Sequence, residues 1–110
     1  MVGPIAPTIE FVQPTEDTPF EFGDTVAFEV AVTDDDPVDC SRVTVRYILG
    51  HDQHGHPITT ATGCSGSITT TAPGHGPGDD LFAVFVATYT DAGNPPQTAT
   101  AQVVLDPSDG

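Results

Sequence analysis

The sequence contains no lysine and no tryptophan, and its only basic side chains besides histidine are Arg42 and Arg46. Against these two arginines stand 16 acidic residues, so the formal net charge is −14. Proteins that bind nucleic acid neutralise phosphates with Lys and Arg, so this composition argues against a nucleic-acid partner. It argues equally against an anionic membrane surface. The excess of carboxylates favours solubility and cations as partners.

Long apolar segments are also missing. No apolar run approaches the roughly 18 residues that suggest a membrane span. The start of the chain, MVGP, has neither the basic region nor the apolar core of a signal peptide. We therefore expect a single module of a longer precursor, with an N-terminal linker over residues 1–7, the folded module over residues 8–105 and a C-terminal linker over residues 106–110.

Helix signals are nearly absent, because 11 prolines and 11 glycines interrupt the chain and no segment keeps a 3.6-residue period. Alternation of apolar and polar residues is plain instead. It predicts seven strands, at residues 8–12, 25–33, 42–49, 58–62, 66–71, 81–90 and 98–105. The number and spacing of these strands predict an all-β, immunoglobulin-like antiparallel β-sandwich.

The two cysteines, Cys40 and Cys64, favour a disulfide over a redox or zinc role, since neither lies in a C-x-x-C motif. If successive strands run antiparallel, the connections that hold these cysteines lie at the same end of the sandwich, as a disulfide requires. Closing a loop of about 25 residues stabilises a fold by roughly 3 kcal/mol in the chain-entropy model. The disulfide predicts an oxidising compartment, so we expect a secreted, extracellular protein.

Three blocks of the sequence, FEFGDTVAFEVAVTD, YILGHDQHGHP and ATGCSGSITTT, carry a family resemblance. Together they resemble the PKD-like, immunoglobulin-type module of secreted actinobacterial multidomain proteins, over nearly all of residues 7–105. In those proteins the module lies beside ThuA-like or sugar-dehydrogenase-like domains and carbohydrate-binding modules. The resemblance implies an accessory module of a carbohydrate-related protein, whose partners are neighbouring domains and a polysaccharide.

Histidines and carboxylates cluster in two connections that the antiparallel topology places at one end. Imidazole and carboxylate ligands together suit Zn²⁺, Ni²⁺ or Cu²⁺. The alternatives are polar residues of an exposed glycine-rich turn, or hydrogen bonding to a glycan or a neighbouring domain. The candidate ligands are His51, Asp52, His54, His56, His75 and Asp79.

A second cluster holds carboxylate and amide oxygens at the opposite, cysteine-bearing end. Such oxygens are the ligands that Ca²⁺ prefers, although the spacing is not that of an EF-hand loop. The alternative is a solvated acidic turn whose Asp residues bend the backbone. The candidate ligands are Asp34, Asp35, Asp36, Asp91 and Asn94.

Carbohydrate-binding sandwiches usually stack sugar rings on exposed aromatic side chains. Tyr47 and Tyr89 alternate with outward-facing residues and are predicted to point into the core. Phe20 and Phe22 could form a small ligand platform, or they could cover the open end of the core. The aromatic residues therefore give a glycan site little support of their own.

The sequence has no nucleophile elbow and no phosphate-binding glycine loop, so we expect that the chain is not an enzyme. The leading hypothesis is a non-catalytic accessory module that acts as a spacer or contacts a glycan or a partner protein. The alternatives are a divalent-metal-binding module and a structural linker stiffened by calcium.

Overall fold

A computed structural model describes residues 7–16, 18–34, 37–51, 54–71, 81–91 and 96–106, and for residues 51 and 54–56 it describes the backbone alone. These residues form seven β-strands and one short 3₁₀ helix, η1. In chain order, the elements are β1 (Thr8–Gln13), β2 (Thr25–Thr33), η1 (Cys40–Arg42), β3 (Val43–His51), β4 (His54–Thr62), β5 (Ser65–Thr69), β6 (Leu81–Thr90) and β7 (Thr98–Leu105).

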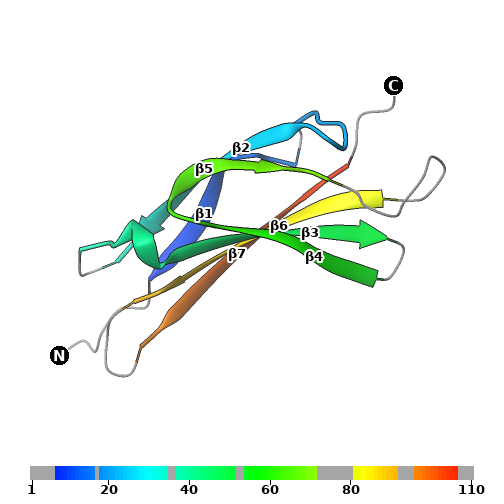
Figure 1. The fold of residues 1–110 in the computed structure, drawn as a ribbon. Helices are drawn as coiled ribbons and strands as arrows, with labels where there is room; N and C mark the ends of the chain where they lie inside the picture. Colours follow the sequence, from blue (N-terminus) through cyan, green and yellow to red (C-terminus); the bar gives the residue numbers. More distant parts are fainter. Residues whose placement is uncertain are drawn as a thin grey trace.

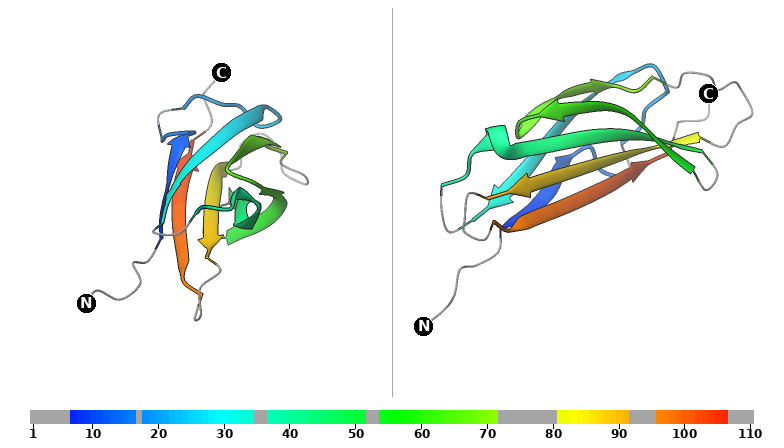
Figure 2. Two further views of the ribbon diagram at one scale, coloured as in Figure 1. Left: turned by 90° about the vertical axis from the view of Figure 1, so that its left-hand side faces the viewer. Right: turned by 60° about the horizontal axis from the view of Figure 1, so that its bottom comes forward.

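The strands form two antiparallel sheets that face each other (Figure 1). One sheet has three strands in the order β1-β2-β5, and the other has four in the order β4-β3-β6-β7. The four strands of the larger sheet lie side by side in the right-hand view of Figure 2. The predicted all-β architecture of seven strands in two antiparallel sheets is therefore confirmed.

The core between the sheets follows from the alternation in the sequence. Along β3, every second side chain from Val43 to Leu49 is fully buried. The same period of two buries Ala83 to Tyr89 on β6 and Val26 to Val30 on β2. The side chains between them point outward, so the outer face of the four-stranded sheet is also fixed by parity.

The hairpin between β3 and β4 is longer than the sequence predicted. The expected connection over residues 50–57 is largely strand: Gly50 pairs with Gly55 and Leu49 with His56. Proline lacks a backbone N–H, but Pro57 is tolerated in β4 because β4 is an edge strand of the sheet and its register shifts at this point. The expected strand at residues 42–49 begins one residue later, because Arg42 closes η1.

The two ends of the sandwich differ, and the chain passes from one to the other. The disulfide end holds Cys40 and Cys64, and the hairpin end holds the β3–β4 turn. Thr8 starts β1 opposite Thr33, the last residue of β2, at the disulfide end. Leu105 ends β7 opposite Ala83, whose other partner is Leu49, at the hairpin end (Figure 1).

The predicted disulfide is present. Cys40 and Cys64 are bonded, with their Cα atoms 5.1 Å apart. Cys40 lies in η1 before β3, and Cys64 lies in the turn between β4 and β5. The backbone C=O of Cys64 also accepts a 2.8 Å hydrogen bond from the Val30 N–H of β2, so the turn contacts both sheets.

Candidate functional site

The histidine cluster is described only in part. The strand register places His51 opposite His54 and His56 opposite Leu49, so the three histidine backbones share the hairpin end. Asp52, His75 and Asp79 lie outside the described residues. Within the part of the chain that the structure describes, no group of three or more His, Cys, Asp or Glu side chains could hold a metal ion. The transition-metal site stays a prediction.

The acidic cluster is likewise divided. Asp35, Asp36 and Asn94 lie outside the described residues, whereas Asp34 follows β2 and Asp91 follows β6 at the disulfide end. The Asp91 carboxylate accepts a 2.8 Å hydrogen bond from the Gln97 N–H. The backbone N–H of Asp91 donates a 3.0 Å hydrogen bond to the Gln97 C=O. Asp91 thus has a structural role in the connection between β6 and β7. The calcium site stays a prediction.

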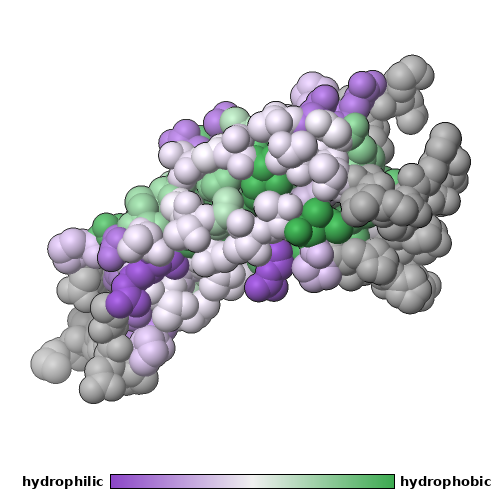
Figure 3. Space-filling view, viewed as in Figure 1, coloured by the Kyte–Doolittle hydropathy of each residue, from purple (hydrophilic) through white to green (hydrophobic). Residues whose placement is uncertain are grey.

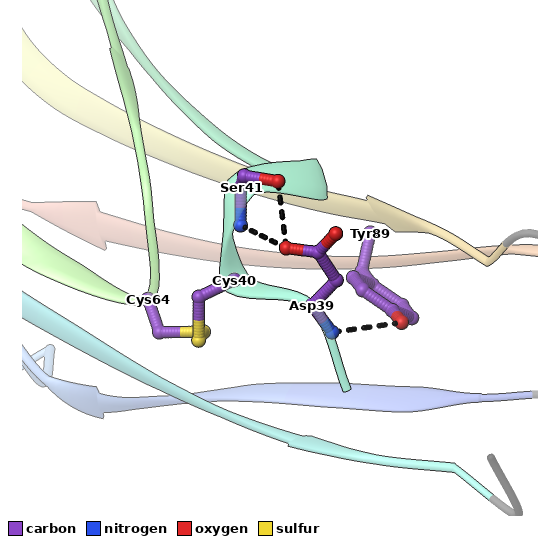
Figure 4. Close-up of a disulfide and its surroundings, with 5 residues drawn as sticks. All are labelled: Asp39, Cys40, Ser41, Cys64 and Tyr89. Carbon is purple, nitrogen blue, oxygen red and sulfur yellow. Dashed lines mark hydrogen bonds between the residues drawn. A yellow bond between two sulfur atoms is a disulfide. The ribbon is translucent and has the colours of Figure 1, made fainter. Parts of the chain in front are cut away.

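Another aspartate at this end, Asp39, caps η1 beside the disulfide (Figure 4). Its Oδ1 accepts hydrogen bonds from the Ser41 hydroxyl at 2.6 Å and the Ser41 N–H at 3.0 Å. Both hydrogen bonds lower the pKa of the Asp39 carboxyl, and the bond from the Ser41 side chain has the larger effect. The Asp39 N–H reaches the Tyr89 hydroxyl of the four-stranded sheet at 3.5 Å. The cap therefore orients the segment that carries Cys40.

The aromatic residues weighed from the sequence lie mostly in the core. Tyr47 and Tyr89 are buried, as predicted. Phe20 is only 3% exposed and packs edge-to-face on the half-buried Phe22, with ring centroids 5.1 Å apart. Phe20 therefore covers the core and does not present its ring to solvent.

Threonines form a regular array on the outer face of the four-stranded sheet. One row crosses all four strands in register, through Thr62, Thr44, Thr88 and Thr100. Neighbouring strands are about 4.8 Å apart, so the row repeats at about that interval. Each hydroxyl can both donate and accept a hydrogen bond.

Arg46 occupies the next row, between Thr60 of β4 and Val86 of β6. Together with Thr44, Val86 and Thr88 it lines a shallow depression of about 200 Å³. As the structure describes them, β3, β4, β6 and β7 contain no Asp or Glu, although the chain has 16. On the described strands, the outer face therefore presents the exposed guanidinium of Arg46 and no carboxylate.

Toward the hairpin end the same face becomes apolar. A third row crosses the sheet through Pro57, Ile48, Val84 and Val104, and the last three are half-buried. Beyond it, the half-buried ring of Phe82 lies against Gly50, its partner on β3, where a Cβ atom would overlap the ring. The outer face thus combines an aromatic ring, aliphatic side chains, one guanidinium and a row of hydroxyls.

Sequence reasoning did not identify this face as a site. Arg42 and Arg46 alternate with the apolar residues of 42–49, and the four predicted strands of this sheet contain no Asp or Glu, so both features can be read from the sequence. The contact between Phe82 and Gly50 could not be predicted from the sequence, because only the strand register shows that the two residues are partners. On the side of the molecule in Figure 3, residues of intermediate hydropathy cover much of the middle with hydrophobic residues among them, and strongly hydrophilic residues lie along the margins and toward the ends.

No family model, curated protein or solved structure matches this chain. In the described residues, no helix has the length and apolar character needed to cross a membrane.

Proposed function

We propose that this chain is a non-catalytic, immunoglobulin-like module of a secreted protein, and that it holds the segments on its two sides apart. One observation carries the proposal: the chain enters the sandwich at the disulfide end, at Thr8, and leaves it at the hairpin end, at Leu105. β6 alone, with 10 residues, is about 30 Å long. Segments joined to the two ends are therefore separated by the length of the sandwich.

The order of the strands supports the immunoglobulin-like assignment. With the strands lettered A, B, C, C′, E, F and G, the sheets read A-B-E and C′-C-F-G. Immunoglobulin-type sandwiches pair B with E and C with F in this way, and variable-type domains add C′ beside C. The disulfide joins different positions from the B–F bridge of antibody domains. The disulfide also supports an extracellular location, because such bonds persist in oxidising compartments.

A distance measurement between the ends tests the spacer role. Spin labels attached through non-cysteine amino acids at positions 8 and 106 should give a narrow distribution centred beyond about 30 Å, the length of a ten-residue strand. A control pair at positions 8 and 33, which are Cα partners, should give a short distance. A broad distribution for the first pair, with a narrow one for the control, would refute a rigid spacer.

The strand register favours one second candidate, a transition-metal site at the hairpin end. Directly opposite residues on neighbouring antiparallel strands are about 5 Å apart, and His51 and His54 are such a pair. Zn²⁺ titration at pH 8 and pH 5 tests the site, because imidazole must be deprotonated to bind metal. Binding at pH 8 that His54→Gln abolishes would support it. Equal affinity at the two pH values would refute it.

A further inference from the structure

The outer face of the four-stranded sheet differs from the rest of the molecule in charge. The three-stranded sheet carries Glu10 and Glu29 on its strands, whereas the four strands of the larger sheet carry no carboxylate at all. Strand propensity accounts for the threonines, which suit exposed strand positions. Strand propensity does not account for a guanidinium on a sheet whose four strands carry no carboxylate, in a chain with net charge −14.

We propose that this outer face binds an extended polysaccharide that carries carboxylate groups. Arg46 pairs with a carboxylate of the polysaccharide, because a guanidinium can hold a carboxylate through two parallel hydrogen bonds. The row from Thr44 to Thr88 supplies donors and acceptors for sugar hydroxyls. Phe82, lying against Gly50, offers an aromatic surface for the apolar face of a sugar ring.

The dimensions of the face suit a chain of several sugars. Phe82 and Thr88 are six positions apart on β6, so the site extends for about 20 Å along the strand. Arg46, opposite Val86, lies between them beside the depression. A ligand that lies along β6 thus meets the aromatic ring, the guanidinium and the hydroxyl row in succession.

The observations favour a polysaccharide over other anionic partners. An extended peptide adds to the edge of a sheet through backbone hydrogen bonds, whereas these groups lie on the face. Duplex nucleic acid carries one phosphate charge per about 1.7 Å and requires several cations to neutralise its phosphates, whereas a polysaccharide carries at most one carboxylate on each sugar. A single guanidinium suits the wider spacing, and Arg46 is the only Lys or Arg residue on the four strands. A second copy of the chain would place one Arg46 face against another, and the four strands offer no carboxylate that could pair with either guanidinium.

Calorimetric titration of the full chain with polygalacturonate tests the proposal, with its methyl-esterified form as a neutral ligand of the same backbone. At about 0.15 M salt, where a Debye length of about 8 Å screens the repulsion between the two polyanions, we expect binding to polygalacturonate. Binding to the ester should be at least about tenfold weaker, because charge-assisted hydrogen bonds are lost. No binding to polygalacturonate, or equal binding to the two forms, would overturn the proposal. So would equal binding to poly-glutamate, which would indicate a peptide site.

A pair of arginine variants locates the site. Arg46→Gln should weaken polygalacturonate binding about tenfold, whereas Arg42→Gln, which removes the same charge from η1, should change the affinity less than about twofold. Both side chains are exposed, so thermal unfolding should show both variants folded. Equal losses in the two variants would show a non-specific charge effect and overturn the assignment to the outer face. The binding site is independent of the spacer role, since the spin-label distances do not involve Arg46.

Discussion

The hydroxyl of Tyr47 is the buried polar group with the clearest predicted effect on stability. It donates a 2.9 Å hydrogen bond to the Thr71 C=O just beyond β5, and so links the four-stranded sheet to the chain that follows the three-stranded one. Burial raises the pKa of Tyr47 from 10.0 to about 12. Between pH 10 and pH 12 the Tyr47 hydroxyl therefore loses its proton more readily in the unfolded chain than in the folded one.

Stability should therefore fall as the pH rises from about 10 to about 12, and the contribution of Tyr47 should be fully present below pH 10. Urea unfolding at a series of pH values measures the slope. Tyr47→Phe should reduce the slope in this window and cost about 1 kcal/mol at neutral pH through the lost hydrogen bond. An unchanged alkaline slope in the variant would assign the effect to other groups.

Gly50 is required by the ring of Phe82. A Cβ atom at Gly50 would overlap that ring, so Gly50→Ala should destabilise the fold by about 2 kcal/mol. In a Phe82→Ala background the same substitution should cost less than about 0.5 kcal/mol, because the obstacle is gone. Urea unfolding of the wild type, the two single variants and the double variant measures these costs as a double-mutant cycle. A cost that persists without the ring would contradict the assignment of the effect to Phe82.

Among the elements, the disulfide joins η1 to the turn between β4 and β5. Cys40 and Cys64 are 24 positions apart, and the residues between them include all of β3 and β4. Replacing both with alanine should lower the free energy of unfolding by about 3 kcal/mol. Urea unfolding of the variant and of the wild type, each with and without reductant, measures the loss. Reductant should leave the variant unchanged, and a variant as stable as the oxidised wild type would contradict the prediction.

The sequence predicted the strands where alternation is strict and failed where backbone pairing decides. β2, β6 and β7 have their predicted bounds, because β2 and β7 alternate without a break and β6 is a nearly continuous apolar run. The turn signals of residues 50–57 concealed the extended hairpin, since Gly50 and Gly55 pair despite their poor strand propensity. η1 has no signal of its own beyond the capping Asp39. The outer-face site needed the register, because its groups come from separate strands.

At the scale of the whole molecule, self-repulsion is the dominant electrostatic effect. With 16 acidic residues and two arginines, the folded chain concentrates like charges that the unfolded chain spreads apart. Raising sodium chloride shortens the Debye length from about 30 Å at 0.01 M to about 10 Å at 0.1 M. The thermal midpoint should rise over this range. Circular dichroism measures it, and a midpoint that falls would show that attractive ion pairs outweigh the repulsion.

The opposite positions of Thr8 and Leu105 have a mechanical consequence. Tension applied to the two termini would pull along the strand direction, so the hydrogen bonds that join β1 to β2 and β6 to β7 would be loaded in shear, many at once. The disulfide joins residues 24 positions apart, so the chain between the cysteines would stay closed when the sandwich yields. Under load, reduction of the disulfide would release about 80 Å of additional extended chain. The protein would thus extend under force in two steps, and the second step would occur only after a reductant has cleaved the disulfide.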